Sequence, residues 1–195
     1  GVQVGGLHNE WFAGIGKYDY LGIAVPLAGG KRALAFSGIR FGIDNIPNTL
    51  SLYQEDGSIN YDNVVEFSAA DYAFIGSYAQ RIGKESNNLT FGMNVKIIHR
   101  VIGSFANSWG FGLDAGLQYY TGPFRLSFMA RDVTSTFNAW EFSFKEKEKE
   151  ILKLTNNAIP INRLEYTLPQ FVVGFGYYKN ISKIGILGTL DLVTT

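Results

Sequence analysis

The chain has 195 residues, 17 basic and 17 acidic residues, and no cysteine. A chain of this length predicts one domain, and a net charge of zero argues against a nucleic-acid partner, which would need a basic face. Charged residues make up only 17% of the chain, whereas aromatic residues reach 15% and glycine numbers 23. An average soluble domain has roughly 25% charged residues. The composition fits either a soluble β-sandwich or a β-sheet that faces lipid.

Nine stretches of the sequence alternate between apolar residues and polar or small ones, which is the period of a β-strand. In chain order the predicted strands are 2–10, 15–27, 32–44, 67–82, 89–105, 108–120, 123–134, 166–179 and 183–194. Most are longer than the usual globular strand of about 5–6 residues. They also exceed the roughly 9–11 residues with which a tilted strand crosses the hydrocarbon of a membrane.

The stretch 109–119 shows the alternation most clearly. Its odd positions are Trp, Phe, Leu, Ala, Leu and Tyr, and its even positions are Gly, Gly, Asp, Gly and Gln. A strand of this kind has one apolar face and one polar or small face, as in the wall of a membrane β-barrel. No apolar run approaches the roughly 18 residues of a membrane helix.

The connections between the predicted strands are sorted by length. The two long ones, 45–66 and 135–165, are the third and the seventh, whereas the second, fourth, sixth and eighth are short turns. In an antiparallel meander both long connections then lie at one end. Outer-membrane barrels have short periplasmic turns and longer outside loops. The sequence therefore predicts an all-β fold, a transmembrane antiparallel β-barrel whose long loops face outward.

Charged residues inside the predicted strands fall on the polar face by parity. Because a charged side chain in lipid costs up to about 2–4 kcal/mol near the midplane, we expect this group to face the lumen or to lie near a rim: Lys96, Arg100, Asp114, Arg125 and Arg131. They could pair with one another as a structural network or line the path of a ligand.

The long connection 135–165 carries two further signals. Trp140, Phe142 and Phe144 alternate near its start, which favours contact with a partner over solvation. The run of alternating charges at 145–150, followed by 151–154, predicts a short surface helix supported by i,i+4 pairs.

No motif in the sequence points to catalysis or to a cofactor. His8 and His99 lie in different strands, and no metal-binding spacing is present. No serine stands in a Gly-x-Ser-x-Gly elbow. The glycine pairs at 110 and 112 and at 174 and 176 lie within strands, so we interpret them as packing positions and not as a phosphate loop. We expect no enzyme activity, no metal and no cofactor.

Six segments resemble the PorV/PorQ family, a branch of the FadL-like outer-membrane proteins of Bacteroidetes. They are HNEWF at 8–12, FSAADYAF at 67–74, NVKIIHR at 94–100, WGFGLDAGLQY at 109–119, MARDVTSTFNAW at 129–140 and TLPQFVVGFGY at 167–177. The resemblance implies the outer membrane of a Gram-negative, Bacteroidetes-type bacterium. It also implies a FadL-like barrel of about fourteen strands. Because about nine strands are present and the family's N-terminal plug is missing, we expect residues 1–195 to be one barrel domain, an internal fragment of a longer barrel.

The resemblance implies three functions. The first is an accessory role in the type IX secretion system, with contacts to the translocon and to cargo signal domains through the long loops. The second is FadL-like transport of hydrophobic small molecules. The third is a structural barrel in a surface assembly. Each implies contact with outer-membrane lipid and lipopolysaccharide.

Overall fold

The computed structural model describes the chain except residues 53–57, 85–86, 182–183 and 195. The described residues form eleven β-strands: β1 (Gln3–Trp11), β2 (Gly16–Leu27), β3 (Arg32–Asn48), β4 (Val65–Lys84), β5 (Asn87–Ile102), β6 (Ala106–Thr121), β7 (Phe124–Arg131), β8 (Thr136–Phe142), β9 (Arg163–Thr167), β10 (Gln170–Ile181) and β11 (Ile184–Thr194). One α-helix, α1 (Glu146–Leu154), and two 3-10 helices, η1 (Ala28–Gly30) and η2 (Tyr61–Asn63), complete them. The predicted all-β fold is confirmed.

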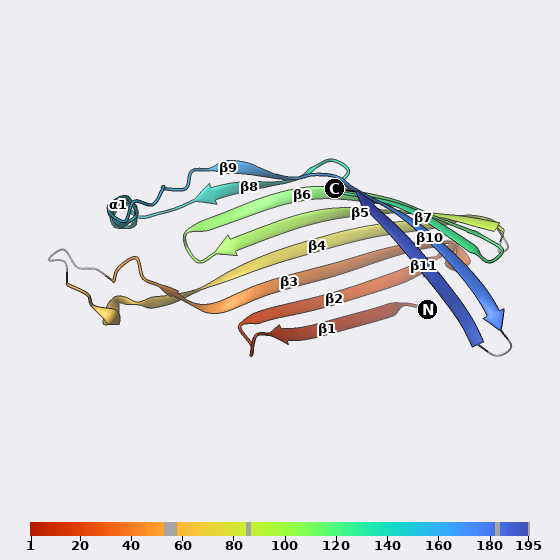
Figure 1. Ribbon diagram of the computed structural model, residues 1–195, viewed down its shortest axis with the longest axis horizontal. Helices are drawn as coiled ribbons and strands as arrows, with labels where there is room; N and C mark the ends of the chain where they lie inside the picture. Colours follow the sequence, from red (N-terminus) through yellow and green to blue (C-terminus); the bar gives the residue numbers. More distant parts are fainter. Residues whose placement is uncertain (53–57, 85–86, 182–183, 195) are drawn as a thin grey trace.

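All the strands belong to one antiparallel sheet with the main order β1-β2-β3-β4-β5-β6-β7-β10-β11. Figure 1 shows β1 to β6 side by side as a curved wall, with β10 and β11 crossing the view at a steep angle to them. Such a change of direction follows from the twist that every β-sheet accumulates. The described strands form an open sheet, in which β1, β9 and β11 each pair with one strand only. The expected membrane barrel stays a prediction.

Two strands lie where a loop was expected. β8 follows β7 after a break at 132–135, and β9 precedes β10. Both β7 and β8 pair with β6: β8 with the half at 106–111, and β7 with the half at 115–121. β8 therefore continues the line of β7 toward the end with the long connections, and β9 continues the line of β10. When each of these pairs is counted as one long strand, the eleven strands correspond to nine. The loop expected at 135–165 was placed wrongly at its start.

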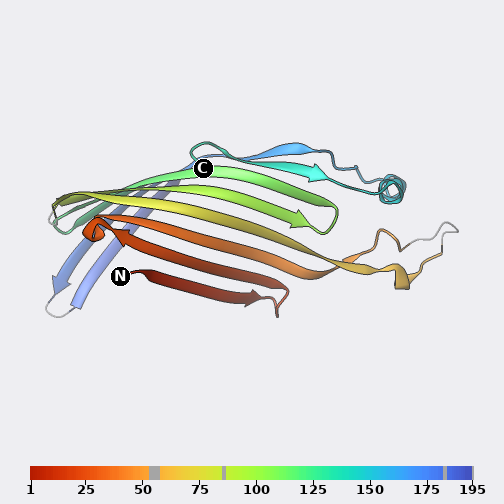
Figure 2. The same ribbon diagram turned by 180° about the vertical axis from the view of Figure 1, so that it is seen from behind.

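The long connections lie at one end of the sheet. Figures 1 and 2 both show α1 and the connection between β3 and β4 projecting from that end, which we call the loop end. Part of that connection, 53–57, lies outside the described residues, as do parts of the short connections expected after the strands 67–82 and 166–179. The helix expected from the charge run is confirmed as α1. In the described chain no helix combines the length and the hydropathy that a membrane span requires.

The register assigns strand residues to two faces, because directly paired residues of an antiparallel sheet point the same way. We call the face of Asp114 the sheltered face and the face of Trp109 the open face. Along β6, Ser108 on the sheltered face is 0% exposed, whereas Trp109 on the open face is 54% exposed. The apolar side chains of β6 therefore lie on its more exposed side.

The alternation reverses phase at three places toward the loop end. In β3, Ile43 and Ile46 share a face across a bulge, in which Asn45 has a φ of 57°. Between β7 and β8, Ala130 and Phe137 share the open face. Between β9 and β10 the same holds for Tyr166 and Phe171. Each bulge turns the following residues to the opposite side of the sheet.

Aromatic side chains gather at the loop end, and the reversal before β8 adds Trp140 and Phe142 to them. Phe67 and Phe144 contact Phe105 with ring centroids 5.2 Å and 5.6 Å away. Trp140 and Phe142 stack at 5.9 Å. Phe105 and Trp140 are buried. This part of the sheet thus has its apolar residues on the sheltered side.

Candidate functional site

Lys96 is the centre of an ion-pair network on the sheltered face. Its Nζ lies 2.7 Å from Asp114 Oδ1 and also pairs with the carboxylate of Asp132. Asp114 accepts two further hydrogen bonds, from the backbone N–H of Asp132 at 3.0 Å and from Asn94 Nδ2 at 3.3 Å. The network therefore joins β5 and β6 to the break between β7 and β8.

Two glycines of β6 make room for this network. A Cβ at Gly112 would collide with Thr136 Oγ1 and lie 3.1 Å from Lys96 Cε, and one at Gly110 would lie 2.5 Å from the carbonyl oxygen of Phe137. Because neither Cβ is present, β8 can lie close to β6. At the start of β8, Thr136 Oγ1 donates a hydrogen bond to Asp132 at 2.5 Å. The packing role expected for the glycine at 112 thus serves the ion pairs.

Arg100 forms a second polar group nearer the loop end. Its Nε lies 2.9 Å from Asp71 Oδ1, and its Nη1 lies 3.4 Å from Glu165 Oε2. The guanidinium lies 5.0 Å from the ring centroid of Trp140, whose Nε1 donates to Glu165 at 2.6 Å. β4, β5, β8 and β9 each contribute one residue.

The aromatic residues expected in a contact loop are placed differently. Trp140 and Phe142 belong to β8, and Phe144 follows β8 and stacks on Phe105. Trp140 is only 8% exposed. The phase reversal before β8 is the physical reason, since it turns Trp140 to the sheltered face.

The other charged candidates on the sheltered face have separate partners. The Arg125 guanidinium lies 5.0 Å from the ring centroid of Tyr120 and 5.3 Å from that of Tyr178. Arg131 donates to Gln170 Oε1 at 3.3 Å. All five candidates share one face of the sheet by register, but only Lys96 and Asp114 among them form an ion pair with each other.

An open hollow of about 390 Å³ lies beside Asp114. Its lining includes polar and small residues of β5, β6 and β7, among them Asn94, Gly116, Gln118 and Ser127. The sheltered face thus offers a depression next to the Lys96 network whose lining is mostly apolar and includes a few polar groups. Its chemistry suits an apolar solute with a polar end.

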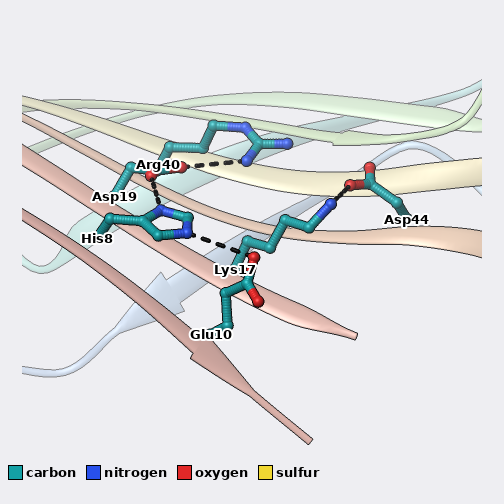
Figure 3. Close-up of polar contacts among 6 residues, drawn as sticks. All are labelled: His8, Glu10, Lys17, Asp19, Arg40 and Asp44. Carbon is teal, nitrogen blue, oxygen red and sulfur yellow. Dashed lines mark hydrogen bonds and ion pairs between the residues drawn. The ribbon is translucent and has the colours of Figure 1, made fainter. Parts of the chain in front are cut away.

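A third polar cluster lies on the open face, and the sequence reasoning missed it. Figure 3 shows the imidazole of His8 between two carboxylates, 2.6 Å from Asp19 and 3.4 Å from Glu10. Arg40 also pairs with Asp19 at 3.3 Å. The neighbouring pair of Lys17 and Asp44 has a distance of 2.9 Å. Only the pairing of β1, β2 and β3 brings these residues together.

In the described part of the chain, no group of three or more His, Asp or Glu residues could hold a metal ion. Neither a protein-family model, nor a curated protein, nor a solved structure matches the chain.

Proposed function

We propose that the chain is part of the wall of an outer-membrane β-barrel, with its open face in lipid. The observation that carries this proposal is the chemistry of that face. Large apolar side chains remain exposed on it across five neighbouring strands, among them Val95, Phe111, Leu117, Leu126, Phe128, Phe171, Phe175 and Leu190. Monomeric soluble proteins rarely expose apolar patches of more than a few hundred Å². In a bilayer the same side chains have a favourable environment.

The sheltered face supports the same proposal from the other side. Lys96 and Arg100 on this face pair with carboxylates, and Lys96 with its partners is largely shielded from solvent. Two buried oxygens near them, Ser108 Oγ and Asn138 Oδ1, have no hydrogen-bond partner in the described residues. Buried polar atoms are usually satisfied by protein or ordered water. A water-containing lumen would supply the missing partners.

Within this class we propose an accessory role in type IX secretion. The resemblance to the PorV/PorQ family, strongest over 129–140, supports it. The common location of both long connections supports it as well, because a partner at the loop end can contact both at once (Figure 1). Translocon subunits and cargo signal domains are the partners on this proposal.

The hollow beside Asp114 favours a second function, the passage of hydrophobic small molecules with a polar end group. On that alternative, a substitution that fills the hollow slows uptake. Gly116→Leu places a larger side chain there, and Gly188→Leu, on the open face of β11, is the matched control.

Two experiments test these proposals. Fractionation of native cells tests the membrane wall, because recovery of the protein outside the outer-membrane fraction contradicts it.

Cross-linking and pull-down from native membranes then test the secretion role. One variant lacks residues 146–154, and a control variant has the turn 28–31 replaced by another tight turn. We expect translocon or cargo proteins with the wild type, fewer with the first variant and unchanged amounts with the second. Recovery of neither kind of protein with the wild type contradicts the secretion role.

A further inference from the structure

An apolar stretch on the open face of β3 is bounded by an arginine at each end. Leu34 and Phe36 lie between Arg32 and Arg40 on this face. At about 3.3 Å per residue, the distance between the two arginines along the strand is about 26 Å, which a tilt of about 40° reduces to about 20 Å along the membrane normal. An outer-membrane barrel has an apolar band about 25 Å tall. With the two arginines placed symmetrically in the proposed wall, each lies within about 3 Å of a boundary of that band, and Arg40 lies on the loop-end side.

Two neighbouring rows of directly paired residues meet at this level: first His8, Asp19 and Arg40, then Glu10, Lys17 and Gly42. A Cβ at Gly42 would lie 2.7 Å from Arg40 Nη2. The absence of that side chain lets the guanidinium extend over the second row, which also carries Lys17. The two permanent cations of the cluster thus point toward one region of the surface (Figure 3).

Carboxylates flank these cations. Asp19 pairs with Arg40, Asp44 pairs with Lys17, and Glu10 contacts His8. A guanidinium has five N–H donors and an ammonium has three, so one carboxylate partner each does not exhaust them. The cluster therefore presents cationic donors beside exposed carboxylate acceptors. This arrangement complements a group that itself carries a phosphate and an ammonium.

A hollow lies on the same face, toward the middle of the wall. It has a volume of about 260 Å³ and an almost wholly apolar lining that includes Leu34, Phe36, Gly76 and Met93. Phe36 precedes Arg40 by four residues, which corresponds to about 13 Å of strand and to about 10 Å of depth at a tilt of about 40°. Half of a hydrocarbon core is about 15 Å thick, so the hollow lies at a depth that an acyl chain occupies. One lipid molecule can therefore have its headgroup at the cluster and an acyl chain in the hollow.

We propose that this surface binds one phosphoethanolamine-type glycerophospholipid. Arg40 and Lys17 hold its phosphate, Asp44 beside Lys17 holds its ammonium, and an acyl chain lies across Gly76. This inference rests on the proposed membrane wall and adds a specific lipid site to it. The chemistry selects a zwitterionic headgroup because cations and carboxylates alternate across the three strands.

Native mass spectrometry of the detergent-purified protein tests the site. The protein is incubated with phosphatidylethanolamine, phosphatidylglycerol and diacylglycerol that have identical acyl chains, and the lipid retained on it is counted. We expect phosphatidylethanolamine to be retained about tenfold over diacylglycerol, as charge-assisted hydrogen bonds predict. Arg40→Gln should abolish most of this preference. Arg32→Gln, on the same face of β3, should leave it unchanged.

The acyl part of the site has its own pair of variants. Gly76→Leu fills the hollow, since a Cβ there meets only Phe36 Cζ, at 3.9 Å, and it should reduce retention of all three lipids. Gly188→Leu, on the open face of β11 with no atom within 4 Å of its Cβ, should not. Circular dichroism of each variant checks the fold.

Three results would overturn the proposal: equal retention of phosphatidylglycerol and phosphatidylethanolamine, equal effects of the two arginine variants, or no lipid retained by the wild type. Failure of the lipid site is separable from failure of the wall. A protein that fractionates with the outer membrane but shows no lipid preference contradicts only the site, whereas a protein absent from the membrane contradicts the wall itself.

Discussion

The Lys96 network and the His8 cluster use the same kinds of side chain on opposite faces of the sheet. Lys96 and Asp114 are 16% and 9% exposed, whereas His8 and Asp19 are 58% and 44% exposed. Exposed ion pairs contribute little to stability, and a buried charge that loses its partner is costly. The sheltered network therefore holds the break between β7 and β8 in place, whereas the side chains of the exposed cluster remain available to molecules at the surface.

The largest expected effect comes from removing the cation of the sheltered network. Lys96→Met leaves Asp114 and Asp132 without it, and should cost about 3 kcal/mol of unfolding free energy. Denaturation of the detergent-solubilised protein, followed by tryptophan fluorescence, measures the loss. Lys149→Met removes the cation of an exposed pair on α1 and should cause no measurable change. Equal effects of the two substitutions would remove the distinction between sheltered and exposed pairs.

The next largest effect tests whether the Lys96 network needs the space that the missing side chain of Gly112 leaves. Gly112→Ala places a methyl group against Thr136 and should cost about 2 kcal/mol through overpacking. Gly116→Ala is the matched control on the same face of β6, because its nearest neighbour is the carbonyl oxygen of Phe128 at 3.5 Å. That variant should stay within about 0.5 kcal/mol of the wild type. A harmless Gly112→Ala would show that β8 does not need its close approach to β6.

A smaller effect is expected from the aromatic part of the sheltered face. Trp140→Phe keeps an aromatic ring, although a smaller one, and loses the hydrogen bond from the indole N–H to Glu165, and it should cost about 1 kcal/mol or more. Trp109→Phe changes an exposed ring on the open face and should leave unfolding unchanged in detergent. The same denaturation experiment compares the two variants. A larger loss for Trp109→Phe would contradict the assignment of the faces.

The smallest effect concerns α1, outside the sheet. The Lys149 ammonium, hydrogen-bonded at 2.6 Å, lowers the pKa of the Glu146 carboxyl. Since the pKa is lowered in the folded state, the pair supports α1 above the ordinary carboxyl pKa and loses its effect as pH falls through the lowered one. An NMR titration of Glu146 should show a lowered pKa that returns to its ordinary value in Lys149→Gln. An unchanged pKa in that variant would show that the pair does not form.

Alternation in the sequence predicted the strands and their faces wherever the pairing is uninterrupted. The stretch 109–119 lies in one strand, β6, with the two faces expected. Alternation did not predict the face of Trp140. β6 has three residues between Phe111 and Ala115, whereas the segment paired with it has six residues between Ala130 and Phe137. Three extra residues reverse the phase. Asp132, with a φ of 52°, is a residue type that tolerates this conformation, but type alone does not locate a bulge.

The polar cluster on the open face was beyond the reach of single-strand patterns. His8, Asp19 and Arg40 each stand in a different strand, and only the register of two hairpins places them in one row. The Lys96 network could be predicted in part from the sequence, because parity puts Lys96 and Asp114 on one face. Its third member, Asp132, lies in the bulge, where parity does not apply.

The phase reversals near the loop end have a consequence for the order of assembly. In the part of the sheet away from the loop end, the apolar side chains lie on the open face. Between the reversals and the loop end, Phe105, Trp140 and their neighbours form a small core on the sheltered side. A core of that kind is stabilised by water around it, not by hydrocarbon. On the proposed topology the loop end must first cross the bilayer, so its aromatic core closes only after the rest of the wall has inserted. That late step would resist backward slippage of the strands through the membrane.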